Sequence, residues 1–142
     1  MAGIVLKARV EHTVNFNEVD MMGVVWHGHY LRYFEMAREA FGRKHGFDVQ
    51  DFIDDSLLAP IVKVAIKHKA PARYGQTLVI EAGHTIKKEP KFVLTFRVTE
   101  KESNRLLVVG QTTQIFTKPS GDVFYFPPPL LKKFWKQWGP AE

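Results

Sequence analysis

The chain has 142 residues, a length typical of one domain, and 45% of them are hydrophobic, which is enough to build a core and excludes a disordered chain. No stretch approaches the ~18 uncharged apolar residues that a membrane span needs. There is no cysteine, which excludes disulfides, thiol nucleophiles and thiolate metal sites and fits a cytoplasmic protein. We therefore expect one domain over residues 1–142.

Twenty basic residues against fifteen acidic ones give a net charge of +5. A solvated basic surface explains this charge, and an anionic ligand such as a nucleotide-bearing cofactor would suit it as well. Nucleic acid is a third option, but the basic residues are spread along the chain and are not gathered in a tail. We therefore expect no nucleic-acid partner.

The first expected element is a strand over residues 8–16, where apolar and polar side chains alternate. The face that we expect to be buried carries Ala8, Val10, Val14 and Phe16. His12 falls on that face too, and a hydrogen-bonded core histidine explains this position better than a catalytic one.

A helical period replaces the alternation from about Gly28 to His45. Its apolar stripe consists of Tyr30, Phe34, Ala37 and Phe41. An apolar face this wide predicts a helix wrapped by a sheet. Gly46 fits a C-terminal stop, and residues 49–55 fit a short second helix.

The rest of the chain reads as strands joined by short turns. Alternating or apolar segments predict strands over residues 62–68, 78–86, 92–100 and 105–117, the last of them more central in the sheet. Turn residues at 87–90, 102–104 and 119–122 predict antiparallel hairpins. A short amphipathic helix from Leu130 to Trp138 follows. The order predicts an α+β fold with one long helix packed on an antiparallel sheet.

Between the first strand and the helix lies one carboxylate, Asp20, followed by a turn around Gly23. The helix opens near His27 or Gly28, so little backbone separates the acid from the positive end of the helix. Unpaired N–H groups there can polarise a carbonyl, and a carboxylate can attack it or activate a water. A turn or N-cap role explains Asp20 equally well from the residues alone.

Two segments carry a family resemblance. The first reads Asp20-x-x-Gly23-Val24-Val25-Trp26-His27-x-x-Tyr30, followed by Leu31-Arg32-Tyr33-Phe34-Glu35 and Ala37-Arg38. It resembles the signature of hotdog-fold acyl-CoA thioesterases of the 4-hydroxybenzoyl-CoA thioesterase type. The second, Pro71-Ala72-Arg73-Tyr74-Gly75, resembles that family's connection between the second and third strands. The resemblance runs from about Val10 to Phe116.

The resemblance implies a five-stranded antiparallel sheet wrapped around one central helix. It implies hydrolysis of acyl-CoA to free acid and coenzyme A, with no cofactor, since coenzyme A enters only as part of the substrate. It also implies a homodimer with the sheets joined edge to edge, often paired into a tetramer, and active sites at the subunit interface.

The same match assigns roles to individual residues. Asp20 would be the catalytic carboxylate, the backbone N–H of His27 would polarise the thioester carbonyl, and Gly23 would allow the turn between them. The expected substrate-binding residues are Val24, Val25, Trp26, Tyr30 and Phe34. A lysine-rich hairpin contacts coenzyme A phosphates in relatives, so the expected coenzyme A-binding residues are Lys87, Lys88 and Lys91, with Lys63 as a weaker candidate.

Several alternatives stay open or are set aside. We expect no metal site, because His27 and His29 lack the further ligands of a zinc signature. Glu35 lies ~12 Å along the helix from His27, too far to serve the same carbonyl, and fits an i, i+3 pair with Arg38. An acyl-carrier-protein thioesterase and a non-catalytic acyl-CoA binding module remain possible. His29 and Gln76 depart from the family pattern, which leaves the acyl group open.

Overall fold

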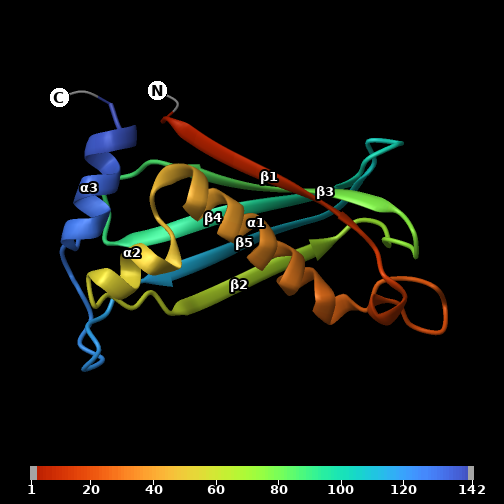
Figure 1. Ribbon diagram of the computed structural model, residues 1–142, viewed down its shortest axis with the longest axis horizontal. Coiled ribbons are helices and arrows are strands. Elements are labelled where there is room, and N and C mark those ends of the chain that lie inside the picture. Colours follow the sequence, from red (N-terminus) through yellow and green to blue (C-terminus); the bar gives the residue numbers. More distant parts are fainter. Residues whose placement is uncertain (1–2, 141–142) are drawn as a thin grey trace.

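The computed structural model describes residues 3–140, and its centre is one long helix lying across a single sheet (Figure 1). The sheet has five strands in the order β1-β3-β4-β5-β2, and every neighbouring pair is antiparallel. The strands are β1 (Val5–Thr13), β2 (Ile61–His68), β3 (Thr77–Thr85), β4 (Lys91–Glu100) and β5 (Leu106–Ile115). The helices are α1 (Tyr30–His45), α2 (Val49–Asp54) and α3 (Pro129–Trp138). The expected architecture is confirmed, including the inner position of the fifth strand.

The helix α1 packs against the sheet through the predicted apolar stripe. Its four members are each at most 2% exposed: Tyr30, Phe34, Ala37 and Phe41. Gly46 ends the helix with φ +72, the left-handed conformation that glycine adopts without steric cost. Its other end is preceded by a short 3-10 helix, His27–His29. The stripe therefore anchors α1 in the core and fixes where its N-terminus lies.

A close contact between α1 and the sheet forms at Gly110 of β5. The ring of Phe34 stacks on Phe96 at 4.4 Å and lies directly against Gly110. A Cβ at position 110 would meet ring atoms of Phe34 at 2.4 and 2.5 Å. Only glycine lets the helix approach the strand this closely.

We expect Gly110→Ala to destabilise the fold by about 1–3 kcal/mol, because overpacking forces the buried Phe34 ring aside. The melting temperature should fall by roughly 5–10 °C, measured by circular dichroism. Adding Phe34→Leu to Gly110→Ala should recover part of this loss by making room for the methyl group. An unchanged melting temperature in the single variant would contradict the contact.

One sequence expectation about burial is wrong. The chain leaves β1 at Thr13 and forms a 3-10 helix at Phe16–Glu18, which breaks the alternation, so Phe16 is 79% exposed. The predicted strand β2 forms and lies at the sheet edge, where Val62 and Val64 are 55% and 45% exposed. Nothing within the described part of this chain covers that edge.

Two buried histidines lie between α1, β3 and α3. The Trp138 indole donates to the backbone oxygen of His45, and the ring of His84 packs against Phe92 and Phe134. Burial lowers the pKa of His84, outweighing its hydrogen bond with the Val93 carbonyl. Burial also lowers the pKa of His45. Both histidines therefore take up a proton less readily in the folded protein than in the unfolded chain.

These histidines should make stability fall as the pH drops below ~6.5. Their folded-state pKa values lie below those of the unfolded chain, so the unfolded chain binds protons first in this window. Urea unfolding midpoints at pH 7.5, 6.5 and 5.5 would show this as a decline confined to the acidic side. A midpoint that stays constant down to pH 5.5 would contradict it.

Candidate active site

Asp20 lies in the loop that joins β1 to α1, at the end of the sheet opposite to α3 (Figure 1). This loop folds back on itself: the Asp20 N–H donates to Val24 O at 2.9 Å, and Val19 pairs with Val25. Gly23 closes the turn with φ +75, which favours glycine. Asp20 and His27 therefore lie on the two legs of one narrow loop.

The turn role considered for Asp20 is realised. Its Oδ1 accepts the Met22 N–H at 2.8 Å, and its own carbonyl accepts the Gly23 N–H at 2.9 Å. The N-cap role is not realised, because Trp26 and His29 occupy the cap positions. The side chain is exposed, and Oδ2 has no hydrogen-bond partner among residues 3–140. One carboxylate oxygen thus shapes the turn, and the other is available to a ligand.

The helix start offers backbone donors on the other leg of the loop. The first bond of the 3-10 helix runs from His29 N to Trp26 O at 2.9 Å. The N–H groups of His27 and Gly28 precede this bond, and neither donates to an acceptor within the described residues. Unpaired N–H groups at such a position carry partial positive charge.

The Trp26 side chain covers this helix start. Its ring lies 4.9 Å from the ring of His27 and 5.5 Å from that of His29, and it is 51% exposed. A Cβ at position 28 would come within 2.1 Å of the Trp26 ring. Gly28 therefore lets the indole pack closely against the backbone that carries the donors.

The other expected substrate-binding residues lie deeper. Val24 is half-buried and pairs with Arg73, while Val25 is buried and donates its N–H to Ala72 O at 2.8 Å. Tyr30 is buried, and its hydroxyl accepts the Ala72 N–H at 3.1 Å. These bonds place residues 71–75, the second matching segment, directly beside the Asp20 loop. Phe34 lies further in, within the core.

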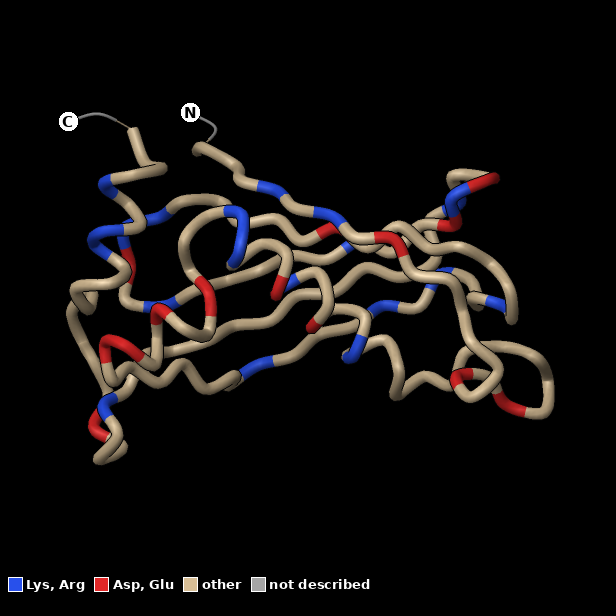
Figure 2. The backbone as a smooth tube through the Cα atoms, in the orientation of Figure 1, with Lys and Arg blue, Asp and Glu red and all other residues tan. Residues whose placement is uncertain are grey.

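The expected coenzyme A-binding lysines are not near Asp20 within one chain. Lys87, Lys88 and Lys91 are exposed on or beside the β3–β4 hairpin, at the end of the sheet that carries α3. The nine residues of β3 separate the two ends by roughly 30 Å. Lys63 is exposed on the edge strand β2. Figure 2 shows that the basic residues are spread over the whole chain, as the sequence suggests.

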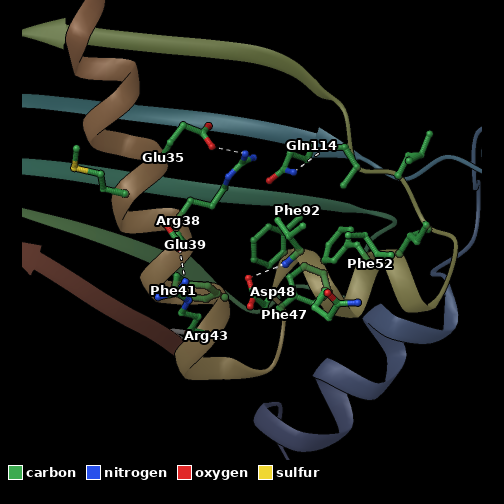
Figure 3. Close-up of a pocket in the computed structure, with 18 of the residues that line it drawn as sticks. Glu35, Arg38, Glu39, Phe41, Arg43, Phe47, Asp48, Phe52, Phe92 and Gln114 are labelled. Atoms are coloured by element: carbon green, nitrogen blue, oxygen red, sulfur yellow. Dashed lines mark hydrogen bonds and ion pairs between the residues drawn. The ribbon is translucent and has the colours of Figure 1, made fainter.

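A cavity of about 960 Å3 runs along one side of α1 toward α2. In Figure 3, Glu35, Arg38 and Glu39 project from α1 beside it, and Phe47, Phe52 and Phe92 form its apolar part. Arg38 donates to Glu35 at 2.5 Å, so the expected i, i+3 pair is confirmed. None of the expected site residues lines this cavity.

One polar cluster near the site was not predicted. His12 is half-buried and hydrogen-bonded, as expected for a core histidine, but its partner is a buried carboxylate, Glu18. A signal in the sequence is that Glu18 is a second acid only two residues from Asp20. Among residues 3–140 there is no group of three potential metal ligands and no helix able to span a membrane.

Comparison with known proteins places this geometry in a family. Residues 14–134 match the family model of the thioesterase-like superfamily. The acyl-CoA thioester hydrolase YbgC of Escherichia coli is 29% identical over 93 residues, which are 66% of this chain and 69% of that protein. The Bacillus subtilis protein YneP is 36% identical over 73 residues, and the matched region is only about half of it, 53%.

Solved structures share the fold. A 1,4-dihydroxy-2-naphthoyl-CoA thioesterase from Synechocystis superposes with a TM-score of 0.78 and 23% identity, covering 92% of this chain and 93% of that chain. A 4-hydroxybenzoyl-CoA thioesterase variant in complex with 4-hydroxybenzoyl-CoA gives a TM-score of 0.76 and 18% identity, covering 89% and 96%. The expected hotdog fold is confirmed.

Proposed function

Because this chain belongs to the thioesterase-like superfamily, we propose that it hydrolyses acyl-CoA thioesters, with Asp20 and the N–H of His27 as the catalytic pair. The observation that carries the proposal is the narrow loop between β1 and α1. It presents an open carboxylate oxygen on one leg and unpaired helix-start N–H groups on the other. The sequence predicts a thioesterase, and several relatives and structural neighbours carry thioesterase names.

The two groups divide the chemistry between them. The N–H of His27 donates to the thioester oxygen and stabilises the negative charge that develops there, an effect typically worth about 3 kcal/mol. Asp20 either attacks the carbonyl carbon, giving an anhydride that water opens, or removes a proton from the attacking water. Both routes expel coenzyme A as a thiolate, which leaves readily and takes up a proton from solvent.

The two routes differ in where oxygen from water ends up. In a single turnover with 18O-labelled water, attack by Asp20 puts the label into the Asp20 carboxylate when water opens the anhydride at that carbon. Activation of water puts the label into the released acid alone. Label found in the peptide that contains Asp20, measured by mass spectrometry, would therefore establish attack by Asp20.

We also propose a homodimer, with tetramers built from it, and an active site shared between copies. The uncovered edge of β2 supports this, since an exposed strand edge is a surface for pairing with another strand. Antiparallel pairing of two β2 edges turns one copy end for end. It brings the Asp20 end of one copy alongside the lysine end of the other, where Lys87 and Lys91 would meet coenzyme A phosphates.

The proposed function is tested by measuring free thiol released from a panel of aryl and aliphatic acyl-CoA thioesters. We expect turnover of at least one member, with kcat/KM above that for the same acyl group on an acyl carrier protein. Preference for the carrier protein would contradict coenzyme A as the natural carrier. Tight binding without thiol release across the panel would indicate a non-catalytic binding module instead.

A further inference from the structure

We propose that Glu18 is a positioning residue that fixes the Asp20 loop relative to the start of α1, through a buried bridge with His12 and Tyr33. This inference rests on the proposed function, because it concerns the placement of the same catalytic pair. Among residues 3–140, no other cluster of buried titratable groups adjoins the Asp20 loop. No catalytic step needs Glu18 itself.

The bridge joins three elements at one carboxylate. Glu18 is 9% exposed, and its Oε1 accepts the Tyr33 hydroxyl at 2.5 Å from the second turn of α1. His12 Nε2, from β1, lies 2.8 Å from Oε1 and 3.0 Å from Oε2. An ionised carboxylate can only accept, so His12 Nε2 carries the proton. The side chain thus ties the strand, the loop and the helix together.

The backbone of Glu18 extends this connection to the catalytic loop. Its carbonyl accepts the Trp26 N–H at 3.0 Å, directly before His27. Asp20 follows two residues after Glu18 on the other leg, and the Val19–Val25 pair closes the loop above it. Glu18 therefore sits at the base of the loop, where a shift of its backbone would move Asp20 and the His27 N–H relative to each other.

The groups that surround the Glu18 carboxylate stabilise its negative charge. Burial alone raises the pKa of Glu18, but the hydrogen bonds from Tyr33 and His12, together with the His12 charge, outweigh burial and hold the pKa below its ordinary value. Buried ionic groups seldom add net stability compared with apolar side chains of equal volume. A fixed geometry beside the site is what this arrangement provides.

The cleanest test removes only the Tyr33 hydroxyl, which reaches from α1 to Glu18. We expect Tyr33→Phe to lower kcat about 10-fold with KM unchanged within about 3-fold, because misplacement of reacting groups by a fraction of an ångström slows the chemical step. Glu18→Ala should lower kcat by about 10- to 100-fold. Glu18→Gln, which keeps the shape and an acceptor for Tyr33, should recover most of the activity.

Coupling between the two residues provides the second readout. If Glu18 and Tyr33 act as one bridge, the double variant Glu18→Ala/Tyr33→Phe should have a kcat no lower than that of Glu18→Ala alone. The matched control is Glu100→Ala, since Glu100 is also 9% exposed but bonds only its own turn at Glu102 and Ser103. At an equal loss of melting temperature, this control should keep its kcat.

Wild-type kcat in both Tyr33→Phe and Glu18→Ala would overturn the proposal, as would an equal loss of kcat in Glu100→Ala. The variant Asp20→Asn, assayed alongside, distinguishes a failure of the bridge from a failure of the proposed catalytic pair. If Asp20→Asn is inactive while both Tyr33→Phe and Glu18→Ala behave as wild type, the bridge fails and the proposed function stands. If Asp20→Asn remains fully active, the proposed catalytic pair itself fails.

Discussion

Asp20→Asn is expected to lower kcat for acyl-CoA hydrolysis by roughly 100- to 10,000-fold while the protein stays folded. The amide is neutral, so it neither attacks a carbonyl nor takes a proton from water. Its oxygen can still accept the Met22 N–H that Oδ1 accepts in the wild type, so the turn is preserved. Steady-state thiol release and the melting temperature measure the two effects separately.

Asp20→Ala is the comparison that separates chemistry from structure. Alanine loses the carboxylate and the acceptor for Met22, so it should match asparagine in kcat and fall below it in melting temperature by a few degrees. Comparable hydrolysis by the wild type and both variants would remove Asp20 from the mechanism and leave it only its turn role.

His27→Pro is the second large effect that we expect, with kcat reduced by about 100- to 1,000-fold. Proline lacks a backbone N–H, so this change deletes the proposed donor and nothing else on the main chain. The position tolerates proline, because it is the first residue of a helical segment and Trp26 before it is extended at φ −61, ψ 135.

His27→Ala is the matched control, because it removes the imidazole and keeps the N–H. We expect it to lose less than about 10-fold in kcat if the backbone carries the effect. The opposite result, a large loss of kcat in His27→Ala and little loss in His27→Pro, would assign the role to the side chain. Circular dichroism of both variants checks that α1 is still formed.

Much of the fold follows from local patterns in the sequence. The apolar stripe from Tyr30 to Phe41 must be buried against another element, and it therefore predicts both α1 and the sheet that covers it. Gly46 and the turn at Gly23 take up the positive φ angles that their sequence contexts predict. These features depend on residues a few positions apart, which is why one sequence suffices for them.

What the sequence did not predict depends on contacts between distant segments. The partners of Glu18 are His12 and Tyr33, and their meeting is set by how α1 docks on β1 rather than by any local pattern. The exposure of Phe16 follows from a 3-10 helix that interrupts the alternation. The uncovered side chains of β2 reflect its edge position, and alternation alone does not distinguish an edge strand from an inner one.

The most direct test of the proposed catalysis is thiol release from one acyl-CoA that binds with equal affinity to the wild type and to Asp20→Asn. We predict rapid release of free coenzyme A by the wild type and near-background release by the variant at saturating thioester. Equal rates from both proteins, or no release from either despite saturation, would contradict thioester hydrolysis at this loop.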